Sequence, residues 1–318
     1  MEHQNTQQIH EHKKSIKHRL FEIYDKKYKT LLIIPFVILI LAIAQIVYQI
    51  STTGDFIKKD VSLKGGVTIT IPYDKVADTD KIENDLSSKF PNNDIVVRTL
   101  RSAASVEGII VEADIDANNN AEKNKFLQSI EESLSIDLST VNYGIEVIGS
   151  SLGASFFRES LVALVIAFLF MGLVVLIYFR TLIPSAAVIL AAFSDMVVAL
   201  AVMNLLDVRI GTAGIAAFLM LIGYSVDTDI LLTVRVLKRR EGTVMDRIIS
   251  SIKTGMTETL TAIVAVTVAM LVTQSEVIRQ IMLILLIGLI ADIFNTWIQN
   301  VGLLRIYVER KAKKGIII

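Results

Sequence analysis

Six apolar runs, each long enough to span a lipid bilayer, leave this sequence few folds to adopt. A helix of about twenty residues crosses the hydrocarbon core, where lipid offers no partner for unpaired backbone groups. The chain has 318 residues, of which 53% are hydrophobic, and its mean hydropathy is +0.56. These features predict a polytopic α-helical membrane protein with six transmembrane helices. The predicted spans are Leu31–Ile50, Leu161–Phe179, Ile183–Leu206, Thr212–Thr233, Met256–Thr273 and Ile281–Leu304.

Lysine and arginine are concentrated on one side of the predicted membrane. The segment before the first span, the segment after the fourth and the carboxyl-terminal tail 306–318 carry seven, six and four of them, whereas the short loops on the other side carry only Arg209 and Arg279. The positive-inside rule predicts that both termini, residues 1–30 and 306–318, are cytoplasmic. Residues 51–157 then lie outside the cell, and residues 158–305 hold the last five helices. No small-x-small cleavage pattern follows the first span, so we expect an anchor rather than a signal peptide.

The acidic segment between the first two spans predicts a separate domain. It has ten basic and seventeen acidic residues, and its apolar pattern changes to short alternating runs. The element order, β-α-β-β-α-β, is that of a ferredoxin-like sheet with helices on one face. The expected fold class is therefore a six-helix membrane bundle with an external α+β ferredoxin-like domain between helices 1 and 2. The predicted elements cover residues 66–73, 79–90, 94–103, 105–115, 120–134 and 143–150.

Four aspartates lie inside the predicted spans. Asp195 is in the third span, Asp292 is in the sixth, and Asp227 and Asp229 are both in the fourth. Because lipid cannot solvate a charge, each carboxyl group must face protein or water, or carry a proton. Residues two apart on a helix differ by about 200° in direction, so Asp227 and Asp229 point to nearly opposite sides. Ser225 shares the face of Asp229.

The sixth span carries a polar stripe. Three polar residues follow Asp292 at the spacing of one helix face, and Gly288 allows a neighbouring helix to approach. Together with two residues of the fourth span, they predict a polar seam inside the helix bundle. The seam consists of Asp229, Ser225, Asn295, Thr296 and Gln299.

Two interpretations of the membrane-embedded carboxyl groups stay open. In the first, they bond to polar side chains of neighbouring helices and only fix the packing. In the second, they form a proton or cation pathway whose protonation changes the packing. No basic residue lies within the predicted spans, so no permanent ion pair can neutralise the carboxylates, and this favours protonation. The candidates for a proton relay are Asp227, Asp195 and Asp292, whereas Asp229 is assigned to packing.

Residue types that many enzymes and metal sites need are missing or misplaced. The sequence has no cysteine, which excludes disulfides, thiol nucleophiles and cysteine metal sites. The sequence "GTAG", residues 211–214, is too short for a phosphate-binding loop and is typical of close helix packing. We expect no catalytic residue, no metal site, no cofactor and no enzyme activity. The histidines, which all lie in the amino-terminal tail, are His3, His10, His12 and His18.

Three motifs resemble those of the SecD/SecF family of protein-export membrane proteins. "DVSLKGGVTI", with Gly65 and Gly66, resembles the D-x-x-x-x-G-G element after the first span, although a plain turn also explains two glycines. "GSSLGASFFRESLVALVIA" resembles the start of the second span in SecF members. "IGYSVDTDILLTVRVLKRREG", with Gly223, Tyr224 and Ser225, resembles their fourth span. The layout of one span, an external domain and five spans also resembles half of a resistance-nodulation-division (RND) transporter.

The fourth span departs from the bacterial pattern of the family. Bacterial SecF members usually have G-Y-S-[VI]-N-[DE], with the acidic residue at the position of Thr228. This chain has Asp227 at the asparagine position instead, which is similar to the V-D-A-N spacing of SecD. With "DIFNTWIQN" in the sixth span, the pattern resembles the archaeal branch. The relay role implied by the resemblance therefore transfers only to this helix turn, and we choose Asp227 within it.

The resemblance implies an accessory subunit of the Sec protein-export machinery in the cell membrane. The implied partners are a SecD-like subunit, the Sec translocon, the translocating polypeptide and membrane lipid, with no nucleic acid. The implied mechanism couples the proton gradient to movement of the external domain. Two alternatives stay open: half of an RND-type small-molecule or lipid transporter, which predicts a doubled chain or a large substrate-binding domain, and a purely structural membrane scaffold.

Overall fold

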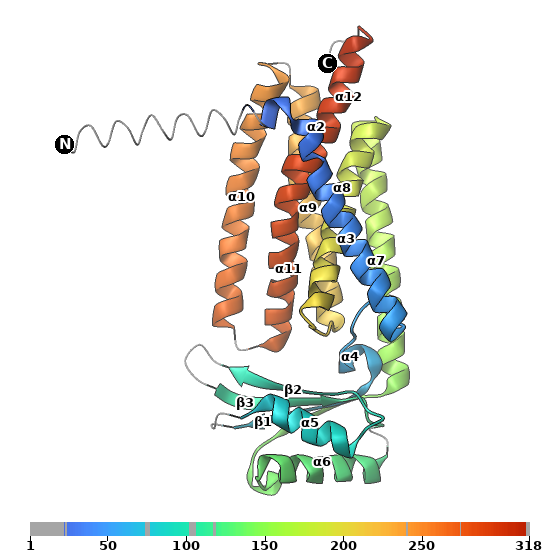
Figure 1. The fold of residues 1–318 in the computed structure, drawn as a ribbon, viewed down its shortest axis with the longest axis vertical. Helices are drawn as coiled ribbons and strands as arrows, with labels where there is room; N and C mark the ends of the chain where they lie inside the picture. Colours follow the sequence, from blue (N-terminus) through green and yellow to red (C-terminus); the bar gives the residue numbers. More distant parts are fainter. Residues whose placement is uncertain are drawn as a thin grey trace, which may run out of the picture.

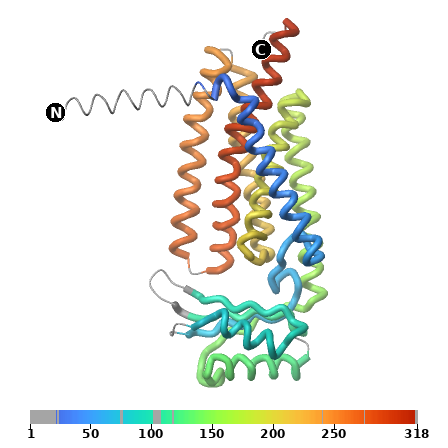
Figure 2. The backbone as a smooth tube through the Cα atoms, in the orientation of Figure 1, coloured from blue at the N-terminus to red at the C-terminus, as the bar shows by residue number. Residues whose placement is uncertain are grey.

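Six long helices form a bundle, and a small α+β domain lies at one end of it (Figure 1, Figure 2). The computed structural model describes residue 22 and residues 24–73, 77–101, 106–116, 119–239, 241–273 and 275–315, so the four histidines lie outside the described residues. Six helices in these ranges are long and apolar enough to cross a membrane, which confirms the predicted fold class. They are α3 (Ile33–Thr53), α7 (Ser150–Phe179), α8 (Leu182–Leu205), α9 (Thr212–Lys238), α10 (Val244–Val272) and α11 (Glu276–Phe294).

Two helices begin well before the apolar runs that predicted them. α10 begins at Val244 rather than Met256, because Thr243 and Asp246 form a capping box that starts a helix in polar sequence. α7 begins at Ser150, so its first turns connect the small domain to the bundle. An apolar run marks the part of a helix that lipid surrounds, and the helix itself extends beyond that part.

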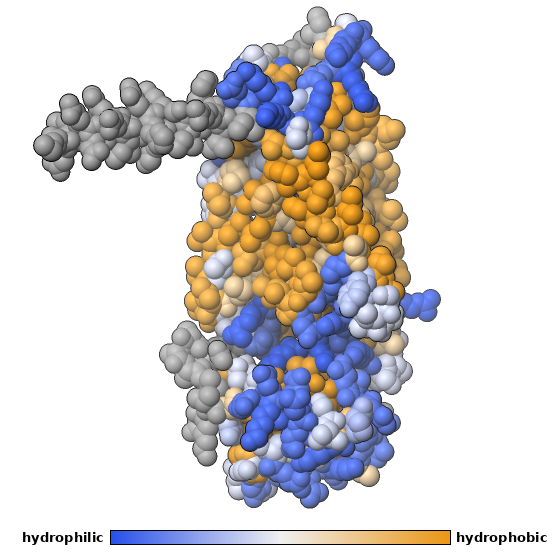
Figure 3. All heavy atoms as spheres, viewed as in Figure 1, coloured by the Kyte–Doolittle hydropathy of each residue, from blue (hydrophilic) through white to orange (hydrophobic). Residues whose placement is uncertain are grey.

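Large apolar side chains cover the outside of the bundle. Ile40 of α3, Leu169 of α7 and Val264 of α10 are 64%, 65% and 62% exposed. Figure 3 shows a band of hydrophobic residues across the visible face of the bundle, with hydrophilic residues at both ends. Soluble proteins rarely expose apolar surface on this scale, so this band is the surface that lipid covers.

The small domain, called the sheet domain below, contains four antiparallel strands in the order β2-β3-β1-β4. Val67, Ile69 and Ile71 of β1 alternate with threonines, so the apolar side chains face α5 and α6 and form the core with them. This arrangement matches the predicted ferredoxin-like order. The elements are β1 (Gly66–Pro72), α5 (Thr79–Lys89), β2 (Ile95–Arg101), β3 (Val106–Ala113), α6 (Asn120–Leu134), η1 (Leu138–Thr140) and β4 (Gly144–Ile148).

A short helix, α4 (Val61–Lys64), and two glycines join the bundle to the sheet domain. Gly65 has a φ of +85°, and a Cβ atom added to it would lie 2.3 Å from the Cα atom of Ser150 in α7. Gly66 has a φ of +139°, and its added Cβ atom would lie 2.2 Å from the Ala113 carbonyl oxygen. Both glycines are therefore required by backbone conformation and by close packing, which is more than a plain turn demands.

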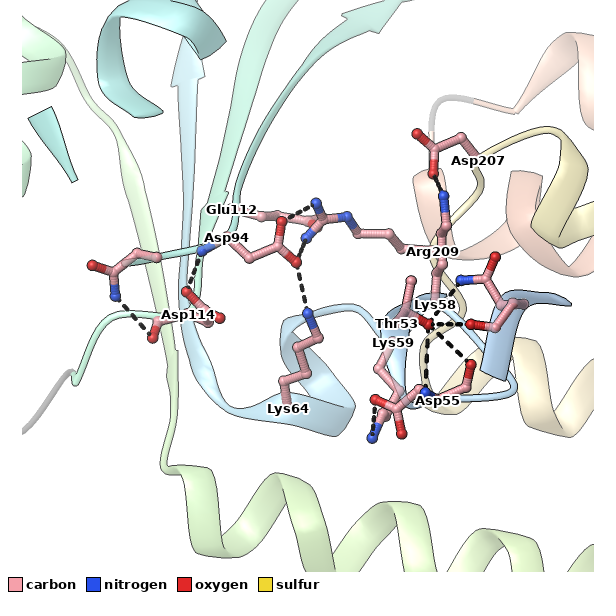
Figure 4. Close-up of polar contacts among 12 residues, drawn as sticks. Thr53, Asp55, Lys58, Lys59, Lys64, Asp94, Glu112, Asp114, Asp207 and Arg209 are labelled. Atoms are coloured by element: carbon pink, nitrogen blue, oxygen red, sulfur yellow. Dashed lines mark hydrogen bonds and ion pairs between the residues drawn. The ribbon is translucent and has the colours of Figure 1, made fainter. Parts of the chain in front are cut away.

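Charged side chains attach the sheet domain to the loop between α8 and α9 (Figure 4). Arg209 of that loop donates two hydrogen bonds to Asp94, just before β2, at 2.8 and 2.6 Å. Lys64 donates another to the same carboxylate at 2.6 Å, and the Asp94 backbone N–H donates to Asp114. Partial burial raises the pKa of Asp94, but the hydrogen bonds and charges of its two cationic partners outweigh this and hold the pKa below its usual value.

We expect Asp94→Asn to lower the free energy of unfolding by about 1 kcal/mol, because solvent screens a pair whose aspartate side chain is 41% exposed. A depressed pKa stabilises the fold above the usual value of 3.8, and this contribution is lost as the pH falls below it. Thermal unfolding of wild type and variant should therefore differ at neutral pH and converge in acid. Asp207→Asn is the control, because Asp207 lies in the α8–α9 loop with Arg209 but pairs with Lys58 through a side chain that is 78% exposed. A loss for Asp94→Asn that is independent of pH would contradict this account.

Candidate functional site

Three carboxyl groups from three helices meet in the interior of the bundle. Asp195 of α8 and Asp229 of α9 are fully buried, and Asp292 of α11 is 1% exposed. The three helices pack against one another, and Ser225 and Thr296 link them through hydrogen bonds to these carboxyl groups. We call this group the carboxyl cluster. Buried polar groups need hydrogen-bond partners, so the neighbours of the cluster decide what it can do.

Asp195 is held by two neutral donors. Ser225 Oγ donates to Asp195 Oδ2 at 2.5 Å, and Asn295 Nδ2 donates to Asp195 Oδ1 at 2.7 Å. Beside Asp195 on α8, Ser194 Oγ accepts a 3.5 Å hydrogen bond from Gln299 Nε2. One carboxyl group thus connects α8 to α9 and to the residues that follow α11.

Asp229 and Asp292 share a hydroxyl group. Thr296 Oγ1 lies 2.9 Å from Asp229 Oδ1 and 2.7 Å from Asp292 Oδ1. Asn300 Nδ2 donates to the same Asp229 oxygen at 2.7 Å, whereas Asp229 Oδ2 has no hydrogen-bond partner among the described residues. A hydroxyl group both donates and accepts, so Thr296 can pass a proton between the two carboxyl groups that it contacts.

A π-helical turn, η2 (Asn295–Asn300), places these donors around the cluster. It continues α11 without a break and leads into α12 (Val301–Lys313). In an α-helix, residues five apart point about 140° away from each other. The i→i+5 bonding of a π turn instead stacks them on one face, so Asn295 and Asn300 both reach the cluster. Such turns are rare and often occur at functional sites.

Asp227, the relay candidate chosen from the sequence, does not join the cluster. It lies on the outer face of α9 with Met220 and Tyr224, which are 44% and 49% exposed. Asp229, which was assigned to packing, takes the interior position. The two aspartates point to opposite sides, as helix geometry predicts. Lipid and protein interior are equally apolar, so the sequence pattern did not reveal which of the two faces Asp195 and Asp292.

The residues of the predicted polar seam all lie in the interior of the bundle. They are Asp229, Ser225, Asn295, Thr296 and Gln299, each at most 2% exposed. Sequence reasoning missed Asn300, although it follows Asp292 and Thr296 at the i, i+4, i+8 spacing of one α-helical face. Its signal was the density of amides in "NTWIQN", three in six residues. In the described part of the chain, no group of three or more histidine, aspartate or glutamate side chains could hold a metal ion.

Comparison with known proteins identifies the family. The sequence matches the family described as "Protein export membrane protein SecD/SecF, C-terminal" over residues 128–310, more than half of the chain. The chain belongs to the SecD/SecF family. SecD/SecF members with similar sequences include the protein-export membrane protein SecF of Methanocaldococcus jannaschii, 36% identical over 91% of this chain and 99% of that protein. The SecF of Pyrococcus furiosus is 35% identical over 94% of this chain and 97% of that protein.

Solved structures of the SecD/SecF family have the same fold. SecDF of Thermus thermophilus, described as a translocon-associated membrane protein, superposes with a TM-score of 0.67 at 17% identity. The superposition covers 89% of this chain but only 38% of that longer chain. SecDF in a super-membrane-facing form gives a TM-score of 0.52 at 16% identity. Family and helices together establish a multi-pass membrane protein, and the two archaeal relatives agree with the predicted branch.

The motifs that carried the SecD/SecF resemblance lie in two places. Gly65 lies in the close contact between α4 and α7, and Gly66, the first residue of β1, lies against the end of β3. Gly223 and Tyr224 lie on the outer face of α9, while Ser225 bonds to the carboxyl cluster from the inner face. The residues of the fourth-span motif of the SecD/SecF family therefore lie on both the outer and the inner face of α9.

Proposed function

We propose that the chain is a SecF-like subunit of the protein-export machinery of the cell membrane. Its support is the similarity to archaeal SecF proteins along nearly their whole length. Because these relatives carry export names, they do not favour the alternative of a small-molecule or lipid transporter. The Sec translocon and the translocating polypeptide are its proposed working partners, and lipid surrounds the apolar band.

In the proposed orientation, the sheet domain lies outside the cell and both termini lie in the cytoplasm. α12 lies at the end of the bundle opposite the sheet domain (Figure 1). Its last turn carries Arg310, Lys311 and Lys313, and the positive-inside rule assigns such an end to the cytoplasm. Residues 51–157 then form the external domain, residues 31–50 and 158–305 form the bundle, and residues 1–30 and 306–318 are cytoplasmic.

A SecD-like subunit is the proposed partner of the outer face of α9, which lies between α7 and α10. A carboxyl group that faces lipid is costly, whereas small residues allow another helix to approach closely. Gly223 leaves open space, because a Cβ atom added to it meets no atom within 4 Å. A second membrane protein therefore suits this face better than lipid does. The exposed residues of the face are Ala216, Met220, Gly223, Tyr224 and Asp227.

Proton coupling is the second part of the proposal. It rests on the Thr296 hydroxyl group, which contacts both Asp229 and Asp292. One hydroxyl hydrogen cannot make full hydrogen bonds to Asp229 and Asp292 at once, so one carboxyl group donates its own proton to Thr296 Oγ1. Asp229 Oδ1 also accepts from Asn300, which favours Asp229 as acceptor and Asp292 as donor. Transfer of one proton through the hydroxyl reverses these roles. The relay in this proposal consists of Asp292, Thr296 and Asp229, with Asp195 as the neighbouring carboxyl group.

The loop that carries Arg209 connects this relay to the sheet domain. It joins the end of α8, which contains Asp195, to the start of α9, which contains Asp229. Arg209 in turn bonds to Asp94 of the sheet domain. A proton transfer that changes the packing of α8 against α9 therefore moves the anchor of the sheet domain. This is the coupling that we propose between proton movement and export.

Single cysteines test the partner, because the sequence contains no other cysteine. We expect Tyr224→Cys, on the outer face of α9, to cross-link to a SecD-like subunit in native membranes. Ile40→Cys is the control, since Ile40 is 64% exposed, more than the 49% of Tyr224, but lies on α3, which packs against α8. Cross-linking of Ile40→Cys alone would contradict the proposed interface. Normal secretion in a strain without the gene for this chain would contradict the export role itself.

A further inference from the structure

The segment before α3 contacts the π turn from outside the bundle. The Tyr24 hydroxyl donates a hydrogen bond to the Trp297 carbonyl oxygen, with an O–O distance of 2.6 Å. Trp297 lies in the middle of η2, between the residues whose side chains bond to the carboxyl cluster. A residue near the amino terminus thus holds the backbone of the turn that shapes the cluster.

α10 packs against the Trp297 side chain. The indole is 5% exposed and lies against Gly255, where an added Cβ atom would be 2.4 Å from Trp297 Cζ2. Any side chain at Gly255 would therefore displace the ring. The packing against α10 fixes the Trp297 side chain, and the bond from Tyr24 fixes its carbonyl group.

Tyr24 is itself held in place by α12. Arg305 Nη2 donates to Asp25 Oδ1 at 2.8 Å, and the Arg305 guanidinium group lies 4.2 Å from the ring centroid of Tyr28 in α2 (Tyr28–Leu31). The segment around Tyr24 is thereby attached to the helix that follows η2. Tyr24, α12 and the π turn are connected as one unit.

We propose that Tyr24 is a positioning residue for the carboxyl cluster. Its hydroxyl holds η2 in the π register, in which Asn295 and Asn300 share a face. If the turn relaxes to α-helical bonding, the two amides separate by about 140°, and Asp195 or Asp229 loses its donor. The segment before the first span therefore sets the hydrogen bonding of the buried carboxyl groups.

Tyr24→Phe tests this inference, because it removes the hydroxyl and keeps the ring. In the full chain, purified in lipid nanodiscs, we expect amide hydrogen exchange across residues 295–300 to become about tenfold faster. We also expect the infrared carbonyl absorption of the carboxyl cluster to change, because its donors move. A purely structural role of Tyr24 would leave this absorption unaltered. Tyr307→Phe, which removes a hydroxyl from α12 itself, is the matched control.

Unchanged exchange and unchanged carboxyl absorption in Tyr24→Phe would overturn the inference, as would equal changes in Tyr307→Phe. Asp25→Asn is a second variant, which loosens the contact with Arg305 and keeps the Tyr24 hydroxyl. We expect it to change the same two signals by a smaller amount, and wild-type signals would count against the inference. The inferred effect of Tyr24 on the hydrogen bonding of the carboxyl cluster does not rest on the proposed function. Only an effect of Tyr24→Phe on protein export would. If the relay variants retain export while Tyr24→Phe alters the absorption, the proposed proton coupling fails and this inference holds.

Discussion

Asp229→Asn is expected to reduce protein export and proton flux by at least about tenfold, whereas Asp227→Asn retains most of both. An amide cannot take up or release a proton, although its Oδ1 atom can still accept from Thr296 and Asn300. Its NH2 group then takes the place of Asp229 Oδ2, which has no partner among the described residues. Because Asp229 is fully buried, solvent cannot supply an acceptor for this NH2 group. Asp227 lies on the outer face of α9 and bonds to no member of the carboxyl cluster in the described structure.

The two variants form a matched pair, since they make the same change two residues apart on one helix. Export is measured as secretion of a reporter in a strain that lacks the native copy, after membrane levels of the variants have been compared. Proton flux is measured with a pH-sensitive dye in proteoliposomes that contain the chain and its SecD-like partner. An inactive Asp227→Asn with an active Asp229→Asn would place the relay on the outer face of α9. Full activity of both would leave the carboxyl groups a packing role only.

The sheet domain could be predicted from the sequence because each of its elements has a local signal. Alternating apolar residues such as Val67, Ile69 and Ile71 identify a strand that is buried on one side. Asp78 and Asn119 cap the amino termini of α5 and α6, and they precede amphipathic spacing in each case. The six spans could also be predicted from the sequence, since the bilayer sets their length and apolarity.

The site was harder to predict because, in a membrane, an apolar helix face does not show which side of the helix is buried in the protein. In a soluble protein an apolar face marks the core, but Tyr224 and Asp227 face outward from α9 while the similarly apolar opposite face is buried. Helix geometry could separate Asp227 from Asp229 but could not say which of them faces Asp195. That choice depends on the packing of α8, α9 and α11, which no local pattern specifies.

Two further features depend on contacts that are distant in the sequence. The π turn brings Asn295 and Asn300 to one face, which regular helical spacing does not predict. The ion pair between Asp94 and Arg209 joins residues 115 positions apart. Neither residue has a local sequence signal that predicts its partner. The two meet only because the sheet domain lies against the α8–α9 loop.

Gly65→Ala is expected to destabilise the protein by about 3 kcal/mol or more, because it adds a backbone clash to a strained conformation. The new Cβ atom would lie 2.3 Å from Ser150 Cα and 2.6 Å from the Ser150 backbone nitrogen. Backbone atoms cannot move aside as a flexible side chain can, so α4 and α7 must separate. The measurement is thermal unfolding of the purified variant, together with protease sensitivity of the sheet domain.

Gly54→Ala is the comparison variant. Gly54 ends α3 with a φ of +78° and a ψ of -11°, the left-handed helical region, and an added Cβ atom meets nothing within 4 Å. We therefore expect Gly54→Ala to cost only about 1 kcal/mol. Gly65 has a φ of +85° and a ψ of 158°, a region that side chains adopt at greater cost, so the larger loss for Gly65→Ala combines this strain with the clash against α7. Equal losses would mean that neither the clash nor the additional strain contributes at Gly65.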